Sequence, residues 1–272
     1  MKKQLPNNLN ANEIIKKTKV FLLDLDGTVY IDGELIGEVK HTLQAFRQSG
    51  KQLVFLTNNS SKNEQTYVNR LSDLGVFENQ DIVYSSGRAT IEYLTSEHRD
   101  KSVYLVATDG VKQSFRDAGI NLVESGVPDI CVLAFDTELN YDKMCKFNFA
   151  LRRGAFYVAT HPDLVCPAKD EPIPDVGAFI AMFEKSSNRT PDVIIGKPFT
   201  GMGKAVVEKF KVKPEEITMV GDRLSTDIKF ACNNGFNSIL VLSGESTKQD
   251  YLNSDVTATL MFDSINDAIK YL

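Results

Sequence analysis

The sequence lacks the long apolar and strongly basic segments that direct a chain to membranes or nucleic acids. No stretch approaches the roughly 20 apolar residues of a membrane-spanning helix, and the start, MKKQLPNNLNANEIIKK, has no signal-peptide core. Basic residues form no run longer than a pair and the net charge is −5, so no phosphate-backbone footprint is expected. We expect a soluble, cytoplasmic protein that binds neither membranes nor nucleic acid polymers.

Cysteine and histidine are also scarce. The three histidines do not complete a zinc pattern, and no CxxC spacing joins the four cysteines, which are Cys131, Cys145, Cys166 and Cys232. We expect these cysteines to be reduced and mostly buried in the core. The sequence also has no internal repeat of fixed period and no low-complexity linker.

The sequence does contain short apolar runs that alternate with segments of helical periodicity. This alternation predicts βα units around a parallel sheet. The first predicted helix has Val39, Leu43 and Phe46 on one stripe, and the next opens with a capping box of Ser61 and Glu64. The predicted core strands are residues 20–25, 52–57, 192–195, 217–221 and 238–242.

A second series of apolar runs, at 102–107, 130–135 and 155–160, lies between the core-like segments. A series of this length is typical of a small domain, and its place in the chain indicates an insertion. We therefore predict an α/β fold with a Rossmann-like parallel-sheet catalytic core, residues 1–82 and 188–272, and an inserted α/β cap domain, residues 83–187.

Polar motifs follow four of the five predicted core strands. They are DLDGT (24–28), TNNSS (57–61), GKP (196–198) and GDRLSTDI (221–228). Because ligands of open parallel sheets bind beyond the carboxyl ends of the strands, these motifs are expected to meet in one site.

Two familiar loops are excluded. A calcium loop that began at Asp24 would need glycine at Val29 and glutamate at Leu35. A P-loop that began at Gly196 would need lysine at Met202.

Together the acidic motifs fit phosphoryl chemistry. Asp24 and Asp222 can place carboxylate oxygens around a hard divalent cation, and Mg²⁺ suits so few protein ligands. Asp24 is a candidate nucleophile that forms an aspartyl phosphate. Asp26 is then the candidate general acid and base, which requires Asp26 to be protonated while Asp24 is ionised.

The other two motifs supply groups for the phosphate. Thr57, Asn58 and nearby backbone N–H groups can bind phosphoryl oxygens. Lys197 adds a positive charge, although a lone lysine in this setting is ordinarily a solvated surface residue.

The four motifs, in this order, resemble those of the haloacid dehalogenase superfamily of aspartate-dependent phosphatases. With LVLSGEST after them, they are similar to the NagD-like, p-nitrophenylphosphatase branch with a large α/β (C2-type) cap. The resemblance, from about residue 19 onward, implies the roles given above for Asp24, Asp26, Thr57, Asn58, Lys197 and Asp222. It also implies a Mg²⁺ contact from the carbonyl of Asp26, a supporting role for Asp227, and association of copies through the cap.

The stretch ATHPDLVCP departs from the resembled pattern. His161 stands where relatives often have asparagine, and Asp175 and Val176 lie where a Pro-Gly-x-Gly form is usual. We interpret His161–Pro162 as a strand-ending turn in preference to a substrate contact, and Asp163 stays an open candidate for the substrate.

The leading hypothesis is a Mg²⁺-dependent phosphatase of a small phosphorylated metabolite. The alternatives are a phosphotransferase with an acceptor other than water, and a catalytically quiet module that binds a phosphorylated ligand. The sequence does not distinguish nucleotide, sugar phosphate, glycerol phosphate and pyridoxal phosphate substrates, because side chains of the cap form the pocket.

Overall fold

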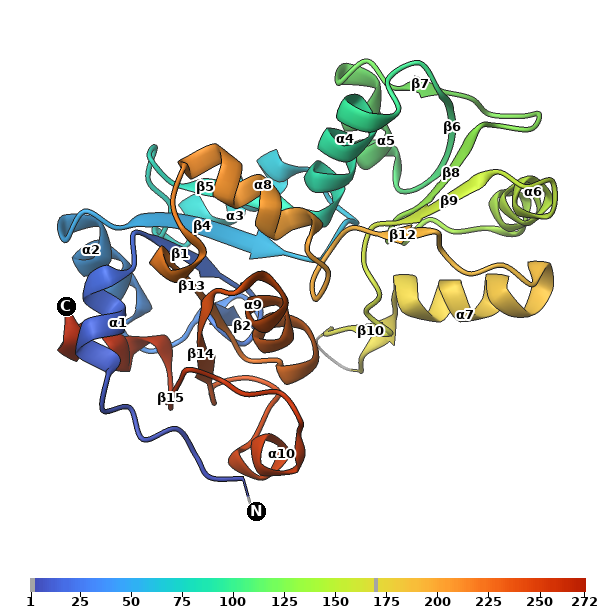
Figure 1. Cartoon of the computed structure of the whole chain (residues 1–272). Helices are drawn as coiled ribbons and strands as arrows, with labels where there is room; N and C mark the ends of the chain where they lie inside the picture. Colours follow the sequence, from blue (N-terminus) through green and yellow to red (C-terminus); the bar gives the residue numbers. More distant parts are fainter. Residues whose placement is uncertain (1–2, 169–170) are drawn as a thin grey trace. The chain divides into compact units, whose positions relative to one another are not determined.

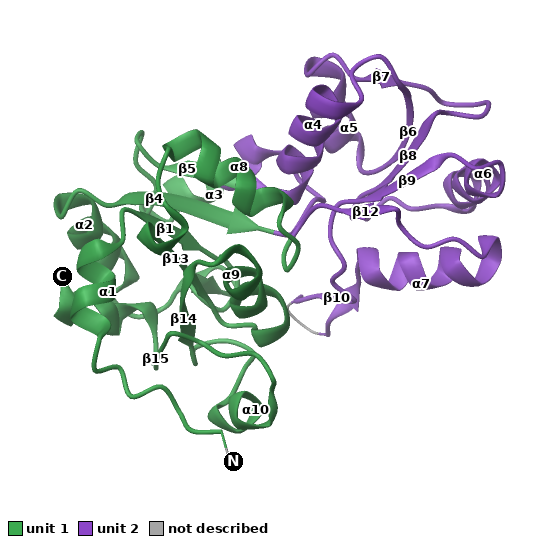
Figure 2. Cartoon of the chain, viewed as in Figure 1, with its two compact units in different colours: residues 1–57, 68–84, 197–272 green, residues 58–67, 85–196 purple. Residues whose placement is uncertain are grey.

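The computed structural model describes residues 3–168 and 171–272, and the chain divides into two compact units (Figure 2). Unit 1 comprises residues 1–57, 68–84 and 197–272, and unit 2 comprises residues 58–67 and 85–196. Among the described residues, no helix combines the length and the apolar character needed to cross a membrane.

Unit 1 is built on a six-stranded sheet with the order β15-β14-β13-β1-β4-β5. Its strands are β1 (Val20–Leu23), β4 (Gln52–Thr57), β5 (Ile82–Ser85), β13 (Ile217–Gly221), β14 (Asn237–Val241) and β15 (Leu260–Phe262). β1 pairs in parallel with both β4 and β13, so the ends of these three strands lie at one edge. All residues of β1 and β13 are buried, as expected for strands covered on both faces.

Helices cover the sheet of unit 1 in two groups. α1 and α2 both contact η3, and α8 contacts α9; Figure 1 shows these groups on opposite faces of the sheet. Their bounds, with the remaining elements of this unit, are α1 (Ala11–Lys17), β2 (Tyr30–Ile31), β3 (Glu34–Leu35), α2 (Val39–Gln48), α8 (Gly201–Phe210), η1 (Pro214–Glu216), η2 (Leu224–Ile228), α9 (Lys229–Asn234), α10 (Lys248–Asn253) and η3 (Ile265–Tyr271). The helix α3 (Glu64–Asp73) begins in unit 2 and ends in unit 1.

Unit 2 has its own parallel sheet, with the order β12-β9-β8-β6-β7. Rings of Tyr104, Phe147, Tyr157 and Phe183 pack in its core. The elements are α4 (Ser86–Glu97), β6 (Ser102–Val106), α5 (Asp109–Asp117), β7 (Asn121–Leu122), β8 (Ile130–Leu133), α6 (Tyr141–Arg152), β9 (Phe156–Ala159), α7 (Val176–Ser187) and β12 (Val193–Ile194), with a two-stranded ladder of β10 (Val165–Cys166) and β11 (Ile173–Pro174). The expected α/β architecture with parallel sheets is confirmed.

One strand was assigned to the wrong sheet. Residues 192–195 were expected in the core sheet, but β12 pairs with β9 in unit 2, with Val193 opposite Val158. An apolar run of this length does not specify which sheet it joins, because pairing depends on distant partners. The edge strand β5 covers residues 82–85 and so spans residue 83, where the insertion was expected to begin, and unit 2 also takes in residues 58–67 and 188–196. The assignment of 83–187 as a cap stays a prediction.

Two local expectations were wrong. Thr66 N donates to Asn63 Oδ1 over 3.0 Å, so Asn63 caps α3 where Ser61 was expected. All four cysteines are free, as expected, but Cys145 and Cys232 are exposed and only Cys131 is fully buried.

Candidate active site

The loop after β1 places Asp24 at the carboxyl end of the sheet. The Asp24 N–H donates to the carbonyl of Val220 over 3.0 Å, which continues the pairing of β1 with β13 by one residue. The chain then reverses direction in a tight turn. Gly27 N donates to Tyr30 O over 2.9 Å, and Asp26 forms an isolated β-bridge with Tyr30. Asp24 is therefore fixed at the strand end, whereas Asp26 lies in the turn and is exposed.

Lys197 is a buried bridge between two carboxylates. Its Nζ donates to Asp24 Oδ1 over 2.6 Å and to Asp227 Oδ1 over 2.7 Å. A third contact, to the carbonyl of Leu56, is 3.3 Å long. The Lys197 side chain is only 2% exposed, so it is not the solvated surface residue that a lone lysine ordinarily is. Because two anions share this cation, the lysine is held at one position beside the candidate nucleophile.

Asp222 and Asp227 follow β13 and its π-helical turn η2. Asp222 Oδ2 accepts from the N–H of Glu245 over 2.7 Å, while Asp222 Oδ1 is buried and has no hydrogen-bond partner among the described residues. Asp227 Oδ2 accepts from the N–H of Arg223 over 3.1 Å, and its Oδ1 is taken by Lys197. Both oxygens of Asp227 are thus used, and one oxygen of Asp222 is available for a ligand.

Glycines are required around the Asp222 carboxylate. A Cβ on Gly27, whose φ is +84°, would lie 2.4 Å from Asp222 Oδ2, and a Cβ on Gly244 would lie 2.0 Å from the same atom. The hydroxyl of Ser243 donates to the carbonyl of Gly27 over 2.7 Å and ties the two loops together. Any larger side chain at either glycine would displace the carboxylate.

The site has more negative than positive charge. Asp24, Asp222 and Asp227 each place one oxygen within 4.8 Å of the others, and Lys197 is the cation that bonds this group. Burial raises the pKa of Asp24 well above its usual value, although Lys197 opposes the shift. Burial, with the nearby charge of Asp227, raises the pKa of Asp222 to about 7.

The pKa of Lys197 is also shifted. Burial alone would lower it, but the carboxylates of Asp227 and Asp24 outweigh burial and raise it. Lys197 therefore stays charged. The protein alone thus raises the pKa of both Asp24 and Asp222, and a further cation would favour the ionised form of both acids. The free Asp222 oxygen and the all-oxygen donor set fit Mg²⁺.

The predicted phosphate-binding residues lie at the end of β4. Thr57 is its last residue and is buried in unit 1. Asn58, the next residue, belongs to unit 2, where its Nδ2 donates to Asp163 Oδ1 over 3.0 Å. The structure thus joins Asp24, Lys197, Asp222 and Asp227 in one cluster, and Asn58 with the two cap candidates His161 and Asp163 in another.

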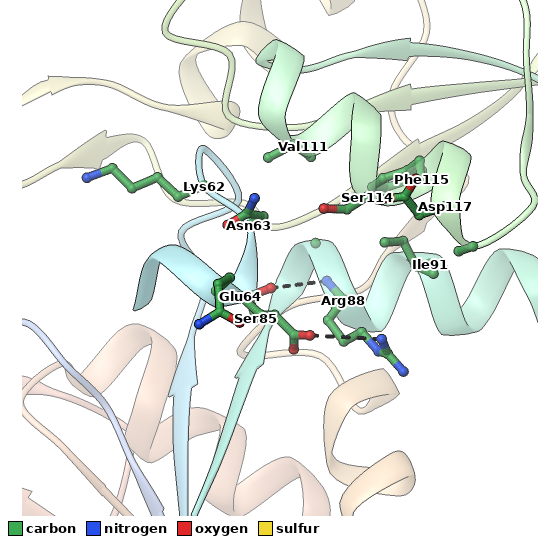
Figure 3. A pocket seen from close by; sticks show the side chains of 13 residues that line it. Lys62, Asn63, Glu64, Ser85, Arg88, Ile91, Val111, Ser114, Phe115 and Asp117 are labelled. Atoms are coloured by element: carbon green, nitrogen blue, oxygen red, sulfur yellow. Dashed lines mark hydrogen bonds and ion pairs between the residues drawn. The ribbon is translucent and has the colours of Figure 1, made fainter. Parts of the chain in front are cut away.

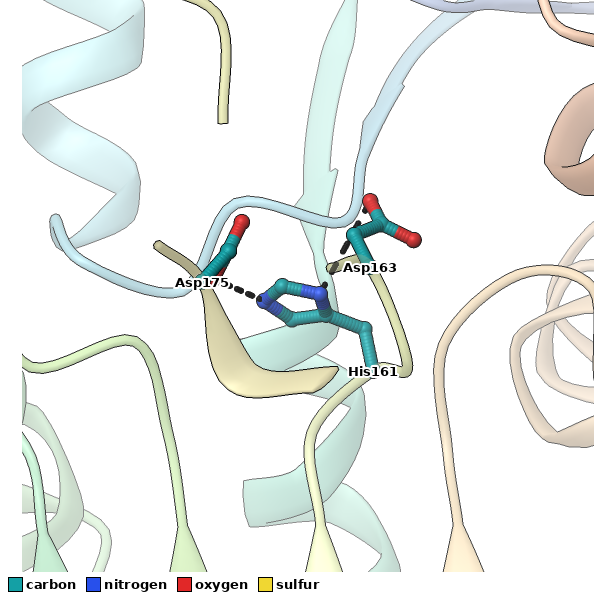
Figure 4. A group of neighbouring side chains, drawn as sticks. All are labelled: His161, Asp163 and Asp175. Atoms are coloured by element: carbon teal, nitrogen blue, oxygen red, sulfur yellow. Dashed lines mark ion pairs between the residues drawn. The ribbon is translucent and has the colours of Figure 1, made fainter. Parts of the chain in front are cut away.

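His161 is fully buried, so it is not exposed to a substrate. Figure 4 shows its ring between Asp163 and Asp175. Nδ1 lies 3.7 Å from Asp163 Oδ2 and Nε2 lies 3.5 Å from Asp175 Oδ1.

A cavity of about 470 Å³ in unit 2 lies elsewhere, among the start of α3, α4 and α5 (Figure 3). Ile91, Val111 and Phe115 contribute its apolar lining, and Arg88 at its rim is paired with Glu92. None of the predicted site residues lines this cavity, so it is not the candidate active site.

The sequence analysis gave no role to Gly27, Gly244 and Glu245, which shape the surroundings of Asp222. The signal was present in the stretch SGEST, which follows β14 in the same way as the other motifs follow their strands. Its function depends on a contact with Asp222 from another strand end, which sequence spacing does not reveal.

Comparisons with known proteins agree with the fold and the motifs. The model of the haloacid dehalogenase-like hydrolases matches residues 21–121, and a HAD-hydrolase-like model matches residues 194–268. An acid sugar phosphatase of Staphylococcus aureus is 29% identical over 258 residues, which cover 95% of this chain and 99% of that protein.

Solved structures give the same result. The 4-nitrophenylphosphatase of Thermotoga maritima is 38% identical with a TM-score of 0.91, over 94% of this chain and 98% of that chain. The p-nitrophenyl phosphatase of Archaeoglobus fulgidus is 26% identical with a TM-score of 0.88, over 94% and 99%. The chain belongs to the haloacid dehalogenase-like hydrolases, which confirms the resemblance to the p-nitrophenylphosphatase branch.

Proposed function

We propose that this protein is a Mg²⁺-dependent phosphomonoester hydrolase that acts on a small phosphorylated metabolite through an aspartyl-phosphate intermediate. The observation that carries the proposal is the pairing of the partly buried carboxylate of Asp24 with Lys197, beside an Asp222 oxygen that no group among the described residues occupies. Two of the relatives reported above are named as an acid sugar phosphatase and a 4-nitrophenylphosphatase. Both names denote hydrolysis of small phosphate esters, which supports the same reaction class here.

The residues divide the reaction into two steps. An oxygen of Asp24 forms a bond to phosphorus as the bond from phosphorus to the leaving oxygen breaks, and Asp26 gives that oxygen a proton. Asp26 then takes a proton from water, whose oxygen bonds to phosphorus and releases Asp24 and inorganic phosphate. The exposure of Asp26 in a turn gives it access to both the leaving group and water.

Lys197 and the residues after β4 act on the phosphate. Lys197 is held in place by Asp24 and Asp227, so its charge need not reorganise as charge shifts in the transition state. Thr57 and Asn58 bind phosphoryl oxygens. Asp227 supports the site by positioning Lys197.

Asp24, Asp222 and the carbonyl of Asp26 would hold the Mg²⁺ ion. When bound, the ion neutralises the carboxylates and the phosphate, which otherwise repel each other. Asp227 is the poorer ligand, because backbone and lysine donors occupy both of its oxygens.

Substitution of Asp24 tests this proposal. We expect wild-type protein with Mg²⁺ to release phosphate from members of a panel of nucleotides, sugar phosphates, glycerol phosphates, pyridoxal phosphate and 4-nitrophenyl phosphate. Asp24→Asn should retain less than about 1% of this activity, since the amide is not a competent nucleophile. The control Asp263→Asn changes a carboxylate that is 85% exposed and should be fully active.

The alternatives predict other outcomes. Full activity of Asp24→Asn would refute the mechanism. Phosphate that appears on a second metabolite would indicate a phosphotransferase. Tight binding of phosphorylated compounds without phosphate release would indicate a binding module that has no catalytic activity.

Location and assembly belong to the same proposal. We place the protein in the cytoplasm, where the exposed cysteines Cys145 and Cys232 would stay reduced. We also propose association of copies through α6 of unit 2, which exposes Tyr141 by 78% and Phe149 by 44%. Large exposed apolar side chains on one helix favour a protein partner.

A further inference from the structure

We propose that His161 is a positioning residue that orients the side-chain amide of Asn58 through Asp163. This inference rests on the proposed function only in giving Asn58 a phosphate to bind. The contacts that carry it all lie within unit 2.

The imidazole of His161 lies between two carboxylates, with 3.7 Å to Asp163 Oδ2 and 3.5 Å to Asp175 Oδ1. Asp175 is the N-cap residue of α7, and its Oδ1 accepts from Val176 N over 2.7 Å as well as facing His161 Nε2. Asp163 faces the other ring nitrogen with Oδ2, while its Oδ1 accepts from Asn58. Hydrogen bonds at the two ends, from Val176 N to Asp175 and from Asn58 to Asp163, are thus linked by the imidazole, which approaches both carboxylates at 3.5–3.7 Å.

The orientation of Asn58 follows from the chemistry of Asp163. An ionised carboxylate only accepts hydrogen bonds, so Nδ2 and not Oδ1 of Asn58 must face it. The second hydrogen on Nδ2 can then reach a phosphoryl oxygen. A protonated Asp163 would be able to donate instead, and the amide would lose this preference. The imidazole beside Asp163 limits where this carboxylate can move, so that its Oδ1 stays directed at Asn58.

Packing prevents the network from relaxing. A Cβ on Gly196 would lie 2.6 Å from Asn58 Oδ1, so the amide oxygen sits against bare backbone. A Cβ on Gly177 would lie 2.3 Å from the carbonyl of Pro162, and Gly177 N donates to Asp163 O over 2.7 Å. The loop that carries His161 and Asp163 is thus pressed against the start of α7.

A metal ion is the other use for a histidine and two aspartates. Here the two carboxylates face different ring nitrogens, on opposite sides of the imidazole (Figure 4). One ligand atom from each of the three residues lies within 4.8 Å of the others, but the two carboxylates approach different ring nitrogens, and this arrangement favours the positioning role. His161 and Asp175 are two of the three residues that depart from the pattern that the sequence resembles, and His161 Nε2 lies 3.5 Å from Asp175 Oδ1.

A double-mutant cycle tests the proposal. We expect His161→Phe, which keeps an aromatic ring but removes both nitrogens, to lower kcat/KM for 4-nitrophenyl phosphate about tenfold, mainly through KM. In an Asn58→Ala background the same change should lower kcat/KM less than about twofold, because the side-chain amide that His161 orients is absent. His98→Phe is the matched control, since His98 contacts Tyr93 in the same unit and not Asn58.

A second variant tests the proposal if His161→Phe does not fold. Asp175→Asn removes one carboxylate from the imidazole but preserves an N-cap side chain, so α7 should persist. We expect about a threefold loss of kcat/KM that again disappears in the Asn58→Ala background. If either variant lowered kcat/KM by the same factor in the wild-type and the Asn58→Ala protein, the proposal would be overturned. His161 would then have a purely structural role.

NMR separates this inference from the proposed function. In the protein with Mg²⁺ and no substrate, the side-chain amide signals of Asn58 should move in the same direction in His161→Phe and Asp163→Ala, and not in His98→Phe. If the wild-type protein released no phosphate from any substrate, the proposed function would fail while this shift would still support the network. Unchanged Asn58 signals in His161→Phe would refute the network whatever the activity.

Discussion

Substitution of Asp222 by asparagine is expected to stabilise the metal-free protein while it abolishes the response to Mg²⁺. Burial and the charge of Asp227 raise the pKa of Asp222 from 3.8 to about 7. Between these values the folded protein holds a proton that the unfolded chain releases, so stability falls as the pH rises through this range. An asparagine resembles the protonated acid and keeps an oxygen that accepts from Glu245 N.

The size of the effect follows from the pKa. The rise in the pKa of Asp222 from 3.8 to about 7 corresponds to about 4 kcal/mol of unfolding free energy. The metal-free wild-type protein loses all of this stability above pH 7. We therefore expect Asp222→Asn to raise the free energy of unfolding by about 2–4 kcal/mol at pH 8, and by roughly 1.5 kcal/mol or less at pH 5.

Urea denaturation at both pH values measures this difference, with EDTA and then with excess Mg²⁺. The ion binds only the folded state, so it should stabilise the wild-type protein at pH 8 and have little effect on Asp222→Asn. The control Asp263→Asn alters an exposed carboxylate and should behave as the wild type does. A variant that is less stable than the wild type at pH 8 without metal, or equally stabilised by Mg²⁺, would refute the reasoning.

Three further outcomes are expected. Lys197→Met leaves two carboxylates buried without their cation and should lower the free energy of unfolding at pH 8 by about 3 kcal/mol in urea denaturation; a loss below about 1 kcal/mol would contradict the buried bridge. Gly244→Ala would place a Cβ 2.0 Å from Asp222 Oδ2, and Mg²⁺-dependent turnover should fall at least about tenfold, whereas Gly110→Ala, with no atom within 4 Å, should be active. Phe149→Lys should shift sedimentation toward the monomer, and an unchanged profile would argue against assembly through α6.

The sequence was sufficient to predict which acids come together, because their motifs lie at the ends of strands. DLDGT and GDRLSTDI end neighbouring parallel strands, so the meeting of Asp24 with the acids after β13 followed from the topology of a parallel sheet. The burial of Lys197 did not follow, because it depends on anions contributed by two other strand ends. A local pattern carries no information about such partners.

Other features depend on packing that sequence spacing does not encode. The cradle of Gly27 and Gly244 around Asp222 joins residues more than two hundred positions apart. His161 was interpreted as a strand-ending turn, which its position after β9 supports, but the interpretation missed Asp175 on its far side. Asp175 reaches the ring because it caps a helix that starts beside the same loop.

The division of charge in the site leaves Asp222 without the lysine that Asp24 and Asp227 share. Lys197 Nζ lies 2.6 Å from Asp24 Oδ1 and 2.7 Å from Asp227 Oδ1, so its positive charge stabilises these two carboxylates. Asp222 receives a single backbone donor, from Glu245, and its other oxygen is buried without a partner among the described residues. A second lysine there would relieve the strain but would also occupy the position that a metal ion needs. The glycines around Asp222 exclude side chains that would supply such a donor, and the lone pairs of its buried oxygen are left for a ligand that the folded chain does not itself provide.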